Sequence, residues 1–142
     1  MNINFKSNKK KILDKVEQAE ERALETIGGM AESFAKANLR NNHSVQTGLL
    51  RNSITHARGG KKPAISSYKA DKGDASGEYS GDAPADRSGE KSVYIGTNVE
   101  YAPYVELGTR HSTAKPFLRP AAEGHSDAYR KVLEEELKSV NE

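Results

Sequence analysis

Apolar residues recur at steps of three and four along the first part of the chain, which is the spacing of one face of an α-helix. They predict one long amphipathic helix over about residues 8–40. The apolar positions are Leu13, Val16, Ala19, Ala23, Leu24, Ile27, Met30, Ala31 and Phe34. The pair Gly28-Gly29 costs about 1 kcal/mol per Gly relative to Ala, so we expect either a bend or the close approach of another backbone there. The cluster that supplies the stop signal is Asn38, Arg40, Asn41 and Asn42.

Two short runs with β character predict a small antiparallel sheet. Thr47 is a candidate N-cap in a turn that leads into either a short helix or a strand, and we predict a strand over about 52–58. The second run, over 93–97, is its expected antiparallel neighbour.

The C-terminal part of the chain predicts a short helix followed by a longer one. The short helix ends at Gly108, and Pro103 is tolerated because it falls in the first turn. The last helix is expected to begin near 116–120 and to run to about 139. Its apolar stripe consists of Ala121, Ala122, His125, Ala128, Tyr129, Val132, Leu133, Leu137 and Val140. The predicted fold class is therefore α+β, a single domain over 1–142 with both long helices packed on a small antiparallel sheet.

The segment over 59–92 differs from the rest of the chain. It holds six Gly and only three large apolar residues, while six basic residues balance six acidic ones. Ordering a residue costs about 1–2 kcal/mol of backbone entropy, and three apolar side chains at about 1.5–3 kcal/mol each do not offset that. We therefore expect a long mobile insertion loop that becomes ordered when it binds a neighbouring subunit or another partner. Its candidate interface residues are Ile65, Tyr68, Lys69, Lys72 and Tyr79.

Composition narrows the possible environment and partners. The chain has no Cys, which excludes disulfides and thiolate metal sites and fits a protein that folds in a reducing cytoplasm. No apolar run approaches the roughly 18 residues that cross a bilayer, so we expect no membrane partner. The net charge of +2 is too small to imply nucleic acid as an obligate partner.

The search for catalytic, cofactor or metal residues yields no candidate, so we expect a protein that is not an enzyme and that carries no cofactor. The histidines His43, His56, His111 and His125 are scattered and lack metal-ligand spacing. The carboxylate pair Asp82 and Asp86 falls in the expected mobile segment, which does not hold two groups at a fixed separation.

Two basic clusters, Lys9-Lys10-Lys11 and the one from Arg58 to Lys62, keep a small nucleic-acid-binding protein open as an alternative. No aromatic stacking platform accompanies either cluster, so we favour solvated surface lysines.

Three stretches occur in a fixed order: 47–54, 95–109 and 116–121. Together they resemble the phage tail-component family of the HK-97-like gene-ten type, whose usual segments read TGxLxxSI, GTNVxYAxYVExGT and PFLRPA. Leu107 departs from the pattern, since an aromatic residue is frequent there. The motif residues that we expect to define the fold are Thr47, Gly48, Gly96, Thr97, Tyr101, Tyr104, Glu106, Gly108, Pro116, Phe117, Arg119 and Pro120.

The resemblance implies a structural virion protein of a long-tailed phage, assembled in the host cytoplasm. It implies a tail-completion subunit that joins head to tail in a homo-oligomeric ring, with a hexamer as the expected form in the virion and a monomer as the alternative in solution. The expected partners are the tail tube protein and the neck or connector proteins. A tail terminator that caps the tube is the alternative within the same class.

Two expectations concern particular side chains of these motifs. Tyr101, Tyr104 and Leu107 are expected to be core residues that cover one edge of the sheet. Glu106 and Arg119 are expected either to form a carboxylate–guanidinium pair or to be separately solvated.

Overall fold

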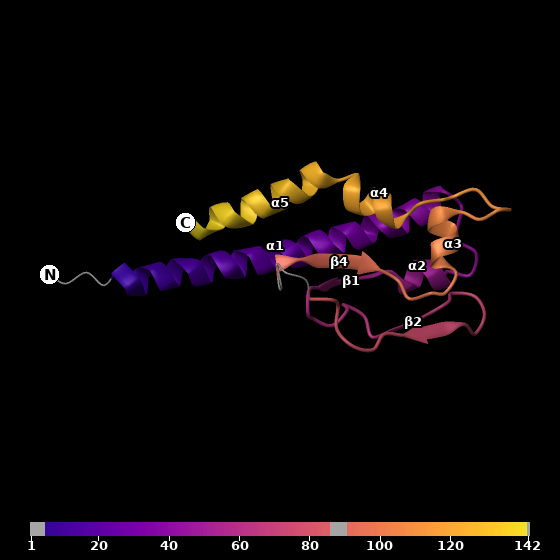
Figure 1. Cartoon of the computed structure of the whole chain (residues 1–142), viewed down its shortest axis with the longest axis horizontal. Coiled ribbons are helices and arrows are strands. Elements are labelled where there is room, and N and C mark those ends of the chain that lie inside the picture. The colour runs from indigo at the N-terminus through magenta and orange to yellow at the C-terminus, as the bar shows by residue number, and fades with distance from the viewer. Residues whose placement is uncertain (1–4, 86–90, 142) are drawn as a thin grey trace.

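A computed structural model describes residues 5–85 and 91–141, and its longest element is the N-terminal helix (Figure 1). Helix α1 runs over Phe5–Asn41 without a break, so the prediction of one long helix is confirmed. A Cβ built on Gly28 would lie 2.7 Å from His56 Cδ2 and 2.8 Å from Val93 Cγ2. Gly28 is therefore crowded by the side chains of His56 and Val93, and not by another backbone as expected.

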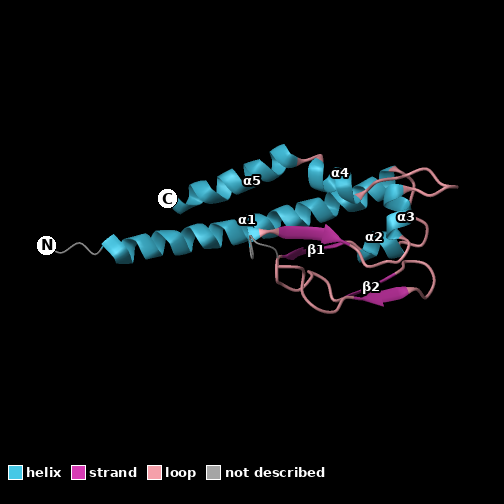
Figure 2. Cartoon of the chain, in the orientation of Figure 1, coloured by secondary structure: helices cyan, strands magenta, loops and turns pink. Residues whose placement is uncertain are grey.

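The predicted antiparallel pair is confirmed. Strand β1 (Thr55–Arg58) pairs with β4 (Val93–Gly96), with Thr55 opposite Gly96, and both strands lie along α1 (Figure 2). The predicted strand over 52–58 begins too early, because residues 52–53 belong to the short helix α2 (Leu49–Ser53). One helical turn puts Leu50 and Ser53 on the same buried side, where the Ser53 hydroxyl donates to the Leu50 carbonyl at 2.6 Å.

The expectation that 59–92 contains no secondary structure is wrong for part of the segment. Strands β2 (Ser67–Lys69) and β3 (Ser76–Glu78) form an antiparallel hairpin, which lies against α2. Mobility of the segment in a free subunit stays a prediction. Asp86, Arg87 and Glu90 of the insertion lie outside the described residues.

The C-terminal part contains three helices, α3 (Ala102–Leu107), α4 (Leu118–Glu123) and α5 (Ser126–Lys138), and the 3-10 turn η2 (Ser139–Asn141). The predicted single final helix is therefore wrong in one respect, since the chain turns at Gly124. The turn lets the His125 ring stack on Phe34 of α1 with centroids 3.6 Å apart. It also lets the Tyr129 hydroxyl of α5 donate to the Ala121 carbonyl at 2.5 Å.

The hydrophobic core occupies the end of the molecule where α2, α3 and α4 surround the C-terminal half of α1 (Figure 1). Its buried members are Ala35, Leu39, Leu50, Ile54, Val99, Ala102, Phe117 and Ala121. The N-terminal turns of α1 do not take part, since Ile12 is 56% and Leu13 is 52% exposed. None of the helices among the described residues has the length and apolar character of a membrane span.

Candidate assembly surface

The three motif stretches of the sequence meet at one end of the molecule. Residues 47–54 form the turn before α2 and α2 itself, residues 95–109 run from β4 through α3, and residues 116–121 open α4. The hydroxyls of Ser53 and Thr97 lie 2.6 Å apart and join the first stretch to the second. Asn38 Nδ2 on α1 donates to the Phe117 carbonyl at 3.1 Å and holds the third stretch in place.

Glu106 caps the N-terminus of α4 from a different helix. Its Oε2 accepts from the N–H of Phe117 at 2.6 Å and of Leu118 at 3.1 Å, and its Oε1 accepts from the N–H of Arg119 at 2.8 Å. No side chain at the N-cap position of α4 accepts these N–H groups, which would otherwise lack a partner. The carboxylate of Glu106 therefore locks α3 to α4.

Neither of the two alternatives for Glu106 and Arg119 describes both side chains: the carboxylate–guanidinium pair is not formed, and Glu106 binds backbone N–H groups instead of being solvated. The Arg119 side chain turns to Glu123, with Nε 3.1 Å from Oε2, and it is 79% exposed. Pro120 lies in the first turn of α4. N–H groups of the first turn make no hydrogen bond within the helix, so the N–H that proline lacks costs the helix nothing there. Pro116 is exposed just before this turn. The Glu106 carboxylate accepts hydrogen bonds from backbone N–H groups. Every residue except proline has such a group, so the residue types in the sequence do not indicate the contact.

Tyr101, Tyr104 and Leu107 are not core residues, contrary to expectation. They are 43%, 63% and 77% exposed. Helix α3 contains only six residues, and its inward side carries Ala102, which is buried, and Val105, which packs against the core. Residues three positions apart share a face of a helix, so the series 101, 104, 107 points outward when 102 and 105 point inward. The outer side of α3 is therefore an exposed apolar surface, which we call the α3 face.

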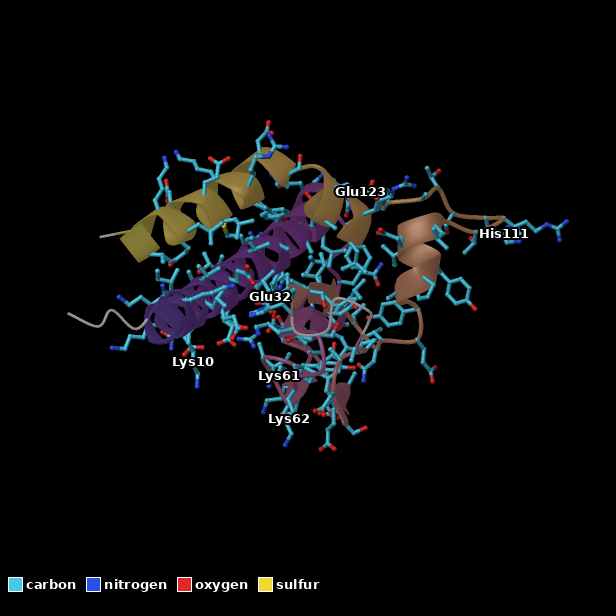
Figure 3. The ribbon with its side chains drawn as sticks, turned by 60° about the vertical axis from the view of Figure 1, so that its left-hand side comes forward. Lys10, Glu32, Lys61, Lys62, His111 and Glu123 are labelled. Carbon is cyan, nitrogen blue, oxygen red and sulfur yellow. The ribbon has the colours of Figure 1, made fainter. Side chains whose placement is uncertain are left out.

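A groove of about 800 Å³ lies beside the α3 face. Its walls come from residues 43–51, from α3 and from the loop over 109–115, and Tyr101, Tyr104 and Leu49 contribute apolar surface. His43, Arg51 and Lys115 are among the lining residues, whereas no Asp or Glu of the described chain lines it. His111 lies at the tip of the same loop, which projects from the body (Figure 3). The groove thus combines aromatic rings with basic groups.

The hairpin uses two of the predicted interface residues to attach itself to its own chain. The rings of Tyr68 and Tyr79 pack with centroids 5.5 Å apart. The Tyr68 hydroxyl donates to Asn98 Oδ1, and the Tyr79 hydroxyl donates to the Ser53 carbonyl. Ile65 is half-buried, whereas Lys69 and Lys72 are exposed, and the interface role of these five residues stays a prediction.

Asp71 joins the hairpin to the first motif stretch. Its carboxylate accepts from Asn52 Nδ2 at 3.0 Å and pairs with the Arg51 guanidinium. The N–H groups of Asp71 and Lys72 both donate to the Thr47 carbonyl, at 2.8 and 3.1 Å. Gly48 has a φ of 86°, and a Cβ there would lie 2.6 Å from Asp71 Oδ2, so both the turn and the contact favour glycine.

The hairpin attachment is expected to weaken in acid. The hydrogen bond from the Asn52 amide is the largest cause that holds the pKa of Asp71 below its ordinary 3.8; desolvation, second in size, raises the pKa, and the charge and hydrogen bond of Arg51 lower it further. A carboxyl with a lowered folded-state pKa stabilises the fold above its ordinary pKa, and this contribution is lost as the pH falls through the folded value. Asp71→Asn should therefore be less stable than the wild type at pH 6, and the difference should shrink below pH 3.8. Urea unfolding at both pH values measures it.

Asp74→Asn is the matched control for this experiment. Asp74 lies in the same hairpin turn and is exposed, and its side chain bonds to no residue that the structure describes. A stability difference for Asp71→Asn that stayed constant down to pH 2.5, or an equal pH dependence for Asp74→Asn, would contradict the assignment.

A histidine that the sequence did not single out holds the sheet to α1. His56 Nε2 lies 2.7 Å from Glu25 Oε1 and its Nδ1 lies 3.2 Å from Glu32 Oε1, and the side chain is 11% exposed. Arg58, two residues on, has NH1 3.8 Å from Glu21 Oε2. Carboxylates on one side of α1 thus face basic groups of β1. The sequence sign of this contact is the seven-residue spacing of Glu25 and Glu32, which places both carboxylates on the same side of α1.

The remaining candidates for chemistry are not brought together. Across residues 5–85 and 91–141, no cluster of three or more His, Asp or Glu side chains is able to hold a metal ion. Of the carboxylate pair Asp82 and Asp86, the second lies outside the described residues. Lys10 lies on α1, whereas Lys61 and Lys62 follow β1, so the two basic clusters come from different elements (Figure 3).

Comparison with known proteins identifies one family. A model of the family described as "Bacteriophage HK97-gp10, putative tail-component" matches residues 4–108. The match includes the first motif stretch and the second up to Gly108, whereas the third, over 116–121, lies beyond it. No curated protein and no solved structure matches the chain. The family is one of phage tail components rather than of enzymes. Because the match covers more than half of the sequence, the chain belongs to the bacteriophage HK97-gp10 tail-component family.

Proposed function

We propose that this tail component is a tail-completion protein, which forms a homo-oligomeric ring, with a hexamer as the expected form, and joins the tail to the head. The observation that carries the proposal is the α3 face with its adjoining groove, because the first two motif stretches build it. On this proposal the protein is made in the host cytoplasm and ends in the virion at the neck–tail interface.

The chemistry of the groove indicates what kind of partner it takes. Tyr is enriched among the residues that dominate binding energy at interfaces, and Tyr101 and Tyr104 flank the groove. The basic groups and the absence of lining carboxylates favour an acidic segment with apolar side chains. Such a segment belongs to the next virion component, a tail tube or connector protein. The exposed Lys69 and Lys72 of the hairpin are proposed as additional contacts to it.

Removing the α3 face should abolish joining while leaving the subunit folded. Tyr104 and Leu107 are more than half exposed, so Tyr104→Ala with Leu107→Ser should change the stability by no more than about 0.5 kcal/mol. Loss of one hot-spot residue costs about 2 kcal/mol of binding, which is about 30-fold in affinity. Phage lacking the gene would be complemented with each variant and viewed by electron microscopy. We expect normal tails lying beside filled heads for the double variant.

Tyr104→Phe is the matched control, because it keeps the ring on the α3 face and should restore joined particles. Tails of unregulated length in the deletion strain would contradict the proposal and favour a tail terminator. Joined, infective particles carrying the double variant would show that the α3 face is not the joining surface.

A further inference from the structure

The first turns of α1 extend beyond the end of α5, as Figure 1 shows. Two large apolar side chains are exposed there, since Ile12 is 56% and Leu13 is 52% exposed. They are neighbours in the chain, so they form one apolar surface rather than two isolated residues. Exposed apolar surface of this kind is typical of interaction sites.

One side of these turns carries a self-complementary pattern. Lys9, Leu13, Val16 and Glu20 lie at positions i, i+4, i+7 and i+11, so they share one side of the helix. We call this the 9–20 side, which reads basic, apolar, apolar, acidic, and Ile12 flanks it. Lys9 is exposed and Glu20 is half-buried, and neither makes an ion pair or a hydrogen bond with a residue that the structure describes.

Two copies of the 9–20 side match when the helices run antiparallel. When Leu13 of one copy faces Val16 of the other, Lys9 faces Glu20, because Lys9 precedes Leu13 by four residues and Glu20 follows Val16 by four. The reverse pairs form by symmetry, so two apolar pairs lie between two ion pairs. In a parallel arrangement Lys9 would face Lys9 and Glu20 would face Glu20. The charges therefore favour the antiparallel direction.

Other occupants fit this side less well. The exposed large apolar side chains of the described residues fall into two groups, which are Ile12 with Leu13 and the α3 face. The groove beside the α3 face is lined by His43, Arg51 and Lys115 and by no described Asp or Glu, so it would repel the four lysines of the first turns. A nucleic acid would pair with the lysines but would leave the apolar surface uncovered. A second copy of the 9–20 side supplies both apolar surface and a carboxylate.

We propose that two free subunits pair through the 9–20 sides of their α1 helices, in antiparallel orientation. Each copy covers Leu13 with Val16 of the other and places Lys9 beside Glu20 of the other. The same patch is used on both copies, so the contact is isologous and closes at two. The pair is therefore a form of the free protein and keeps its exposed apolar surface covered. It goes beyond the proposed function and does not depend on it, since it uses neither the α3 face nor the groove.

The contact is short, so the dimer should dissociate easily. Residues 9–20 span about 17 Å along the helix axis. Interfaces that bury less than about 1,200 Å² in total belong to weak and transient complexes. We therefore expect a monomer–dimer equilibrium, in which the fraction of dimer rises with protein concentration.

The chain contains no Cys, so single cysteines test the register of the pair. Full-length Lys9→Cys and Glu20→Cys proteins would be mixed and treated with a short bismaleimide crosslinker. The product that joins one copy of each is expected, because residue 9 faces residue 20 and the second ion pair of the dimer stays intact. Lys9→Cys alone should give little product, because its two cysteines would lie about 17 Å apart along the helix axis. Lys9→Cys mixed with Ser80→Cys, an exposed position after β3, is the control and should give none.

Charge exchange within one chain tests the same register without crosslinking. Lys9→Glu should weaken self-association about tenfold, measured by sedimentation over a concentration series, because both ion pairs become pairs of like charge. Lys9→Glu with Glu20→Lys should restore it, since the antiparallel pairs are then complementary again. Lys11→Glu is the matched control. It changes the net charge equally, but Lys11 lies about 200° around the helix from Lys9, so it should have no effect.

Several outcomes would overturn the pair. These are a monomer at every concentration, absence of the mixed crosslink, or failure of the charge exchange to restore association. A strong crosslink from Lys9→Cys alone would show a parallel contact and would also reject the proposal. Binding of a 20-base-pair DNA duplex that is lost in Lys9→Glu, with the association of the protein unchanged, would reject it in favour of nucleic acid.

Discussion

Phe117→Ala is expected to lower the free energy of unfolding by about 3–5 kcal/mol. Phe117 is fully buried and is the largest fully buried side chain of the described residues. It belongs to the core cluster formed where α1, α2, α3 and α4 meet. Its backbone is held from two sides, by Glu106 and by Asn38, so the surrounding chain has little freedom to collapse into the cavity. Urea unfolding followed by circular dichroism measures the change.

Tyr104→Ala is the matched control for the Phe117 substitution. It also removes an aromatic ring from a motif residue, but that ring is 63% exposed, so the expected change in stability is within about 0.5 kcal/mol. Equal losses for the two variants would mean that α3 is packed inward, and the assignment of the α3 face would then be wrong.

Glu106→Ala is expected to cost about 2–3 kcal/mol, since hydrogen bonds to a charged group contribute about 1.5–3 kcal/mol and an N-cap about 1 kcal/mol. The substitution leaves the N–H groups of Phe117, Leu118 and Arg119 without their acceptor. Because α4 carries Phe117 at its start, the loss should also loosen the core. Thermal unfolding of the variant, with Glu123→Ala as the carboxylate control on the exposed side of α4, measures it.

A double-mutant cycle distinguishes this cap from the ion pair suggested by the sequence. Glu106→Gln and Arg119→Gln should show no coupling energy, because the Arg119 guanidinium contacts Glu123 and not Glu106. A coupling energy of 1 kcal/mol or more would show that the Glu106 carboxylate does interact with the Arg119 guanidinium. Arg119→Gln alone should be almost neutral, since its side chain is 79% exposed.

The regular elements of this fold follow from local patterns. The three-and-four spacing of apolar residues predicts α1, and the β-branched runs predict the β1–β4 pair with its antiparallel direction. The residue at which the first strand begins is less predictable, because Leu49–Ser53 fits both a turn of helix and a strand. Burial of Leu50 together with Ser53 selects the helix, and burial depends on segments that are distant in sequence.

The hairpin shows why counting apolar residues underestimates order. Residues 59–92 do have few large apolar side chains, as the sequence analysis notes. The described part is nevertheless attached by polar contacts: Asp71 with Arg51 and Asn52, and the Tyr79 hydroxyl with the Ser53 carbonyl. Each partner lies about 20 residues away or more, so a reading of local composition does not include it.

The sequence by itself determines the long first helix, the short helix that ends at Gly108, the pairing of β1 with β4, the absence of cysteine chemistry and the motif residues of the family. These depend on residues close together in the chain, whose periodicity and propensity are visible without a fold. Only the tertiary structure decides that the three motifs meet at one end, that Tyr101, Tyr104 and Leu107 face outward, and that Glu106 binds backbone N–H groups. The physical reason is that exposure and hydrogen bonding are properties of neighbours in space, and a six-residue helix can present either side to the core until the rest of the chain has packed around it.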